Sequence, residues 1–196
     1  MNADTIQTLA LDIFRRSGAF LEGHFILTSG LHSPHYVEKF RVLEHPTLTA
    51  ELCAQIADMW REKNITVVVG PVTGGVILAH EVGRQLGVRA MFTERVDGVM
   101  MMRRGFALTP DDRVLLVEDV VTTGGSIVEV RDVVQKTGAE IVGLAYLVDR
   151  SGGRADFGVP AVPLITLDVV TYPPDACPLC AAGGTAIKPG STGKTV

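Results

Sequence analysis

Residues 114–126, VLLVEDVVTTGGS, are the stretch of the sequence that decides the fold. The stretch begins as an apolar strand, carries two adjacent acids, Glu118 and Asp119, and continues into a turn of threonines and glycines. Ser126, with Glu129 three places on, predicts a capping box at the start of a helix that runs to Gly138. The sequence therefore predicts a strand, a turn and a helix, with both acids at the carboxyl end of the strand.

The same order of strand, turn and helix occurs on both sides of this stretch. Apolar runs typical of buried strands occupy residues 65–70, 88–95 and 141–150, and residues 76–87 have helical periodicity. Further helices are predicted at residues 5–17 and 47–63, with short strand-like pieces between them. Uniformly apolar strands that alternate with helices are typical of a parallel sheet covered on both faces. We therefore expect an α/β fold with a central, mostly parallel sheet.

Composition limits the classes of protein to which the chain can belong. A length of 196 residues, 46% hydrophobic and 20% charged, is typical of a single globular domain, residues 1–196. The net charge of −4 and the short apolar runs favour neither a nucleic-acid partner nor a membrane. Three cysteines and an N-terminus without a secretory signal indicate a cytoplasmic protein.

The turn after the acid pair has the chemistry of a phosphate cradle. Gly124 and Gly125 leave room for backbone N–H groups to converge on an anion, and the dipole of the following helix favours negative charge there. Thr122, Thr123 and Ser126 add hydroxyl donors. The acids would repel a phosphate, so we expect them to bind the hydroxyls of an attached sugar, or Mg²⁺ through water. The alternative is a strand that ends in solvent-exposed acids, followed by a capped helix.

The stretch resembles the phosphoribosyl diphosphate (PRPP) signature of type I phosphoribosyltransferases: an apolar strand, two acids, two apolar residues and T-x-G-x-[ST]. Three further stretches resemble orotate phosphoribosyltransferases: FILTSGLHSPHYVEKF (25–40), VVGPVTGGVILA (68–79) and YLVDRSGG (146–153). The resemblance implies a type I phosphoribosyltransferase fold with a small hood lobe, built from residues 1–45 and about 155–182. Residues 183–196 are expected to be a loosely ordered tail.

The resemblance also implies roles for individual residues. Orotate would be bound by Thr122, Arg150 and Tyr36, with the Arg150 guanidinium matching the orotate carboxylate. The expected catalytic residues are Asp119, Glu118, Arg95, Arg103 and Arg104. The expected PRPP-binding residues are Glu118, Asp119, Val120, Val121, Thr122, Thr123, Gly124, Gly125, Ser126, Thr73 and Gly74. The implied cofactor is Mg²⁺, held by PRPP itself, with Glu118 and Asp119 as further contacts through water.

The chain departs from the family pattern in its lysines. Two positions that are often lysine hold Thr28 and Gly74, and the segment that matches the mobile catalytic loop contains neither lysine nor histidine. Its cations are arginines, which can bind diphosphate with two hydrogen bonds, so we expect arginine to replace lysine. In the family this loop, residues 93–112 here, reaches the neighbouring site, which implies a homodimer. The alternative for VMMMRRGF, residues 99–106, is an exposed hairpin.

The resemblance implies transfer of the phosphoribosyl group from PRPP to orotate, giving orotidine 5′-monophosphate and diphosphate, a step of de novo pyrimidine (UMP) biosynthesis. One alternative is a phosphoribosyltransferase for another base, in which no arginine needs to meet a carboxylate. A second alternative is a non-catalytic PRPP-sensing regulator on the same fold.

Cys177 and Cys180, in the sequence CPLC, have the spacing of half a zinc site. No histidines with the usual ligand spacing accompany them, and Cys53 lies in a predicted helix. The sequence therefore favours a reduced thiol pair in a turn.

Overall fold

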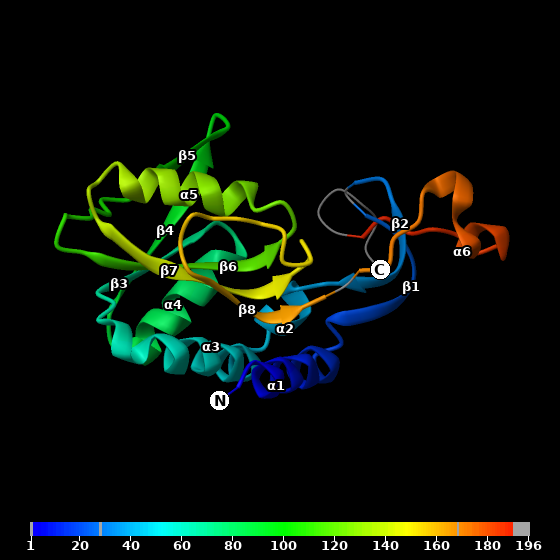
Figure 1. Cartoon of the computed structure of the whole chain (residues 1–196), viewed down its shortest axis with the longest axis horizontal. Coiled ribbons are helices and arrows are strands. Elements are labelled where there is room, and N and C mark those ends of the chain that lie inside the picture. Colours follow the sequence, from blue (N-terminus) through cyan, green and yellow to red (C-terminus); the bar gives the residue numbers. More distant parts are fainter. Residues whose placement is uncertain (1, 28, 168, 190–196) are drawn as a thin grey trace.

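The computed structural model describes residues 2–27, 29–167 and 169–189, which form a six-stranded sheet with helices on both faces and a separate two-stranded hairpin (Figure 1). The helices are α1 (Ala3–Arg16), α2 (Phe40–Leu43), α3 (Pro46–Trp60), α4 (Gly74–Leu86), α5 (Gly125–Gln135) and α6 (Pro178–Ala181), with 3₁₀ turns η1 (Arg61–Lys63) and η2 (Pro174–Ala176). The strands are β1 (Phe20–Ile26), β2 (His32–Val37), β3 (Val67–Pro71), β4 (Arg89–Val96), β5 (Val99–Met102), β6 (Arg113–Val121), β7 (Glu140–Asp149) and β8 (Ala161–Thr166). Thr28 lies outside the described residues.

The central sheet has the strand order β5-β4-β3-β6-β7-β8, and only β5 runs antiparallel to its neighbour. The predicted α/β fold with a mostly parallel sheet is therefore confirmed. From β3 the chain continues through α4 to β4 on one side, and from β6 through α5 to β7 on the other. The strand order thus reverses between β3 and β6, and in such sheets ligands bind beyond the carboxyl ends of the strands at this point.

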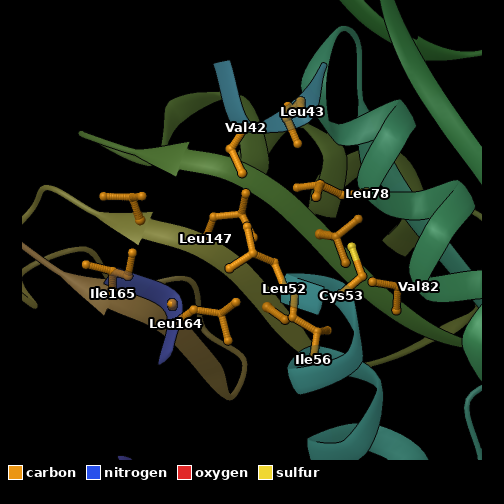
Figure 2. Close-up of a cluster of buried hydrophobic side chains, with 14 of the residues drawn as sticks. Val42, Leu43, Leu52, Cys53, Ile56, Leu78, Val82, Leu147, Leu164 and Ile165 are labelled. Carbon is orange, nitrogen blue, oxygen red and sulfur yellow. The ribbon is translucent and has the colours of Figure 1, made fainter. Parts of the chain in front are cut away.

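Alternating side chains of the strands build two cores, one on each face of the sheet. Val68 and Leu115 pack with α1, α3 and α4 on one face, where Leu52 and Ile56 are fully buried (Figure 2). The next residues along the strands face the opposite core, which α5 covers (Figure 1). Burial of one such leucine or isoleucine stabilises the fold by about 1.5–3 kcal/mol. No helix among the described residues has both the length and the apolar character to span a bilayer.

Two strands were not predicted from the sequence. β5 is only four residues long and forms an antiparallel hairpin with β4, on which Val99 and Met101 are exposed. β8 contains Pro163, which is tolerated because β8 is an edge strand of the sheet. Residues 161–166 therefore belong to the central sheet, although they fall within the predicted hood segment 155–182.

The β1–β2 hairpin and the C-terminal segment form a small lobe beside the sheet (Figure 1). Backbone hydrogen bonds of 2.8 Å join His32 to Tyr172 in both directions and Ile26 N–H to the Ile187 carbonyl. The prediction of a loose tail from residue 183 is therefore wrong for residues 183–189, because Ile187 bridges to β1. Residues 190–196 lie outside the described residues.

Candidate active site

Glu118 and Asp119 lie within β6 and not at its end, because the strand continues to Val121. β6 pairs with β7 along its whole length, but its pairing with β3 stops at Leu116. The two acids are therefore next to the crevice where the strand order reverses, and the end of the strand predicted from the sequence was too early.

Asp119 is the most heavily engaged residue of the site. Lys39 Nζ lies 2.8 Å from each oxygen of its carboxylate, and the Val120 N–H donates to Oδ1 at 2.6 Å. On the other side is the β3–α4 turn, where a Cβ added to Gly74 would lie 2.0 Å from Asp119 Oδ2. The carboxylate is only 4% exposed. Asp119 is thus held in place by a cation and by the closely packed turn of Thr73 and Gly74.

Glu118 is a buried carboxyl group beside Asp119. Burial, and then the negative charge of Asp119, raise the pKa of Glu118 to about 8, although the Asp119 N–H donates to its Oε1 at 3.0 Å. Without a ligand, Glu118 therefore holds its proton to a higher pH than an exposed glutamate does.

The turn after β6 surrounds a cavity of about 220 Å³, lined by Glu118 and residues 120–127. The first intrahelical hydrogen bond of α5 runs from Val128 N–H to Gly124 C=O, so the N–H groups of residues 125–127 have no partner within the helix. Gly124 has φ +80°, and a Cβ there would lie 2.7 Å from the Phe157 ring, so this position requires glycine. The cavity therefore has the donors and the space of an anion site.

The predicted capping box is wrong. Gly124 is the N-cap of α5, with no side-chain hydrogen bond, because the helix begins at Gly125 and already includes Ser126. Glu129 instead binds Arg95, which donates to its two carboxylate oxygens at 3.0 and 3.1 Å. The Ser126 hydroxyl is therefore not used for capping and lies beside the cavity.

A second cavity of about 180 Å³ adjoins the first and shares Val120 and Thr122 with it. Its other lining residues come from β2 and the segment after it, and from the end of β7: Tyr36, Val37, Glu38, Lys39 and Arg150. The two cavities lie on either side of Thr122, so one ligand can occupy both.

Arg150 and Lys39 are the cations that line the second cavity, and burial lowers the pKa of Arg150 below its usual value. Asp149 fixes the turn at this point, because its carboxylate accepts the Ser151 N–H at 2.7 Å and the Gly153 N–H at 3.0 Å. Among the described residues, no carboxylate forms an ion pair with Arg150. A partly desolvated guanidinium in a cavity favours an anionic ligand.

The structure does not bring all the predicted arginines together. Arg95 lies at the cradle, with Nη2 3.5 Å from Ser126 Oγ. Arg103 and Arg104 follow β5 and both pair with Glu94, at 3.7 and 2.9 Å. Of these three arginines, all in the described part of the chain, Arg95 is therefore the one that lies beside the cradle.

Lys39 is the site residue that was missed in the sequence. It lies in the stretch FILTSGLHSPHYVEKF, three residues after Tyr36, and is the only lysine there. Its ion pair joins the start of α2 to β6, which are far apart in the sequence, so no local pattern could reveal it.

Comparisons with known proteins agree with this geometry. The pattern of the phosphoribosyl transferase domain family matches residues 41–157. The orotate phosphoribosyltransferase of Desulforamulus reducens is 51% identical over 92% of this chain and 95% of its own length. That of Heliobacterium modesticaldum is 52% identical over 94% of this chain and 98% of its own.

Among solved structures, the Mycobacterium tuberculosis orotate phosphoribosyltransferase in complex with inorganic phosphate superposes with a TM-score of 0.67 and 25% identity. The match covers 83% of this chain and 95% of that one. The chain belongs to the orotate phosphoribosyltransferases, within the phosphoribosyl transferase domain family.

Proposed function

We propose that the protein transfers the phosphoribosyl group of PRPP to orotate at the two adjoining cavities, giving orotidine 5′-monophosphate and diphosphate for pyrimidine biosynthesis. The observation that carries this assignment is that an anion cradle and a cavity with a partly buried arginine share Thr122. A ribose between them would connect a 5′-phosphate in the first cavity with a base in the second.

The cradle holds the 5′-phosphate of PRPP. The free N–H groups at the start of α5 and the hydroxyls of Thr122, Thr123 and Ser126 are its donors, and the helix dipole adds favourable potential. Val120 and Val121 carry the chain from the acid pair into the cradle. This part of the site binds any ribose 5-phosphate and is independent of the base.

The acid pair holds the ribose. Carboxylates accept hydrogen bonds from its hydroxyls, and negative charge beside C1′ stabilises the oxocarbenium character of the transition state. Glu118 releases its proton when it binds the ribose. An ionised carboxylate accepts hydrogen bonds from hydroxyls at both oxygens, whereas a carboxylic acid carries a donor at one of them. The turn of Thr73 and Gly74, packed on Asp119, is positioned to bind the diphosphate end of PRPP.

Orotate lies in the second cavity. Arg150 pairs with its carboxylate, and Tyr36 covers the ring from the hood. A purine or uracil has no carboxylate and would leave the desolvated Arg150 without a partner, which disfavours the alternative bases. In the reaction, the bond from C1′ to diphosphate breaks and N1 of orotate bonds to the opposite face. The protein thus acts mainly by positioning and electrostatics.

The cations of the site neutralise the charge of the departing diphosphate. Lys39 pairs with Asp119, the acid that we assign to the ribose, and Arg95 lies beside Ser126 at the edge of the cradle. Within the chain we assign part of this role to Lys39 and Arg95, in place of the lysines absent from residues 93–112.

The residues present fit Mg²⁺ bound together with PRPP. Mg²⁺ prefers oxygen ligands and keeps several waters; Glu118 lines the cradle cavity, and the Asp119 carboxylate lies next to it in the sequence, against Lys39 and the β3–α4 turn. Glu118 and Asp119 would hold it through water, and its charge would help neutralise the leaving diphosphate.

We further propose a cytoplasmic homodimer in which Arg103 and Arg104 serve the neighbouring site. The three cysteines, all in the described residues, form no disulfide. Val99 and Met101 on the β4–β5 hairpin are 61% and 44% exposed, which supports a partner that covers this hairpin. The test is to purify Asp119→Asn and Arg104→Ala separately, measure the reduced activity of each, and then mix the two chains. If residues 93–112 act in the neighbouring site, each dimer with one chain of each variant has one intact site, so about a quarter of all sites in an equal mixture regain activity. If the loop acts in its own chain, no site regains activity.

The function is tested by incubating the purified protein with PRPP and Mg²⁺ and each of orotate, uracil, adenine and hypoxanthine. We expect consumption of orotate alone, with one diphosphate released per orotate. Turnover of another base would support the first alternative, and tight PRPP binding without turnover would support a PRPP-sensing regulator.

A further inference from the structure

Four metal-binding side chains meet at the far end of the small lobe. His24 of β1, His32 of β2, Cys177 and Cys180 place one ligand atom each within 4.8 Å of all the others. The histidines come from the N-terminal hairpin, and the cysteines flank the start of α6. Two segments that are far apart in the sequence, the β1–β2 hairpin and the turn at α6, therefore converge on one point.

The distances between these atoms match a tetrahedral zinc site. The Zn–S and Zn–N bond lengths of such sites imply N···S separations of about 3.6 Å. Cys177 Sγ lies 3.6 Å from His24 Nε2, and Cys180 Sγ lies 3.7 Å from that atom and 3.3 Å from His32 Nδ1. The two histidine nitrogens are 2.8 Å apart and would separate by about 0.5 Å around zinc.

The remaining nitrogen of His24 has the partner that a metal-bound histidine needs. Its Nδ1 lies 3.2 Å from the Gly184 carbonyl oxygen. A hydrogen bond donated there places the proton on Nδ1 and leaves the lone pair of Nε2 directed at the two sulfurs. A hydrogen bond between two histidines would explain the short N···N distance, but it gives no reason for two thiols to converge on the same point.

The surroundings show why the lobe needs such a site. Phe25, Leu27 and Cys177 are buried, yet among the described residues they belong to neither of the two hydrophobic cores of the sheet. Small units without a sufficient core are commonly stabilised by a metal. Backbone bonds at Tyr172 and Ile187, on either side of the cysteines, already attach the C-terminal segment to the hairpin.

We propose that His24, His32, Cys177 and Cys180 bind one structural zinc ion that fastens the C-terminal segment to the β1–β2 hairpin. Two thiolates and two imidazoles are the ligand set of structural zinc, and four protein ligands leave no open position for catalysis. His32 lies on the same strand as Tyr36. The ion therefore fixes the start of β2, the strand whose other end carries Tyr36 at the orotate cavity.

The test is the metal content of the untagged full-length protein, purified without chelator and measured by mass spectrometry. We expect about one zinc per chain in the wild type and less than about a fifth of that in Cys180→Ser and His32→Gln. The matched controls are Cys53→Ala, outside the cluster, and His80→Gln on the exposed face of α4, which keep their zinc.

A second arm uses only the wild-type protein, in case the variants do not fold. Zinc is removed with a chelator and replaced with Co²⁺, which gives a thiolate-to-cobalt charge-transfer band when cysteines bind the metal. We expect this band at one equivalent, and protection of two thiols from a thiol reagent when metal is bound. Wild-type protein without zinc that takes up neither zinc nor Co²⁺, or a disulfide between Cys177 and Cys180 in freshly purified protein, would overturn the proposal. Neither arm depends on turnover of orotate.

Discussion

Arg150 is the residue on which the choice of base depends. Its guanidinium is partly desolvated in the second cavity, and Asp149 fixes the backbone of the turn that follows it, so a ligand carboxylate meets a cation that has already lost part of its water. We predict that Arg150→Ala raises the KM for orotate by tenfold or more, about 1.4 kcal/mol, and leaves the KM for PRPP nearly unchanged. Arg154→Ala, an exposed arginine after the same turn, is the control. A rise in the PRPP KM alone would mean that the base lies elsewhere.

Asp119 is expected to act through its charge. In Asp119→Asn the side chain keeps its shape but loses its ion pair with Lys39 and its stabilisation of positive charge on the ribose. We predict a fall in kcat/KM of at least about tenfold, or 1.4 kcal/mol of transition-state stabilisation. Steady-state kinetics with an unfolding curve measure this, and unchanged kinetics in a folded variant would exclude the role.

Glu118 makes stability depend on pH. Burial raises the pKa of Glu118 to about 8 in the folded protein, above the unfolded value of 4.5. Between these two values the folded state holds a proton that the unfolded state has lost. The contribution of Glu118 to stability is therefore complete at a pH below its unfolded pKa of 4.5. It is lost as the pH rises through its folded pKa of about 8. We predict that the free energy of unfolding falls by up to about 1.4 kcal/mol per pH unit between pH 6 and 8.

The matched variant for this effect is Glu118→Gln, which is neutral at every pH. Its stability should show no such slope over the same range, as measured by denaturant unfolding without ligand. Equal slopes in the two proteins would mean that another group titrates.

The β3–α4 turn is expected to act as a unit with the acid pair. An added methyl group at position 74 would lie 2.0 Å from Asp119 Oδ2, so Gly74→Ala must displace the carboxylate from Lys39. We predict at least a tenfold loss of kcat/KM with a folded protein, about 1.4 kcal/mol. Gly87→Ala, at the other end of α4, has nothing within 4 Å of the added Cβ. It should lose stability because φ is +72° but keep its kcat, and equal losses of kcat in both variants would contradict the role of the turn.

Elements with a strong local signal were predictable from the sequence. The apolar strands around the sheet and the cradle after β6 follow from periodicity and turn residues, and the structure has them at nearly the predicted positions. β5 and β8 were missed because one has four residues and the other contains a proline, so neither has the usual pattern of a strand. The capping box failed because Gly124, in a left-handed conformation, begins the helix before Ser126.

Contacts between distant segments could not be predicted. Lys39 meets Asp119 and the two histidines meet the CPLC cysteines only after folding, across 80 and about 150 residues of sequence. The histidines have a spacing set by a β-hairpin with an irregular register between Glu22 and Phe25, and not by a helix, so they do not match the usual zinc-finger pattern.

At the scale of the whole molecule, the sheet and the small lobe each supply one side of the site. The sheet provides the cradle, the acids and Arg150, and the lobe provides Tyr36 and the segment that carries Lys39. The end of the lobe away from the site carries the four-ligand cluster. The geometry of the base cavity therefore depends on how the lobe is held against the sheet.

A crystal structure with orotidine 5′-monophosphate tests directly whether the two cavities form one site. We predict that the phosphate accepts hydrogen bonds from the backbone of residues 123–126, that the ribose lies over Glu118 and Asp119, and that Arg150 binds the carboxylate of the base. A nucleotide whose phosphate lies outside the cradle, or whose base lies away from Arg150, would contradict this arrangement.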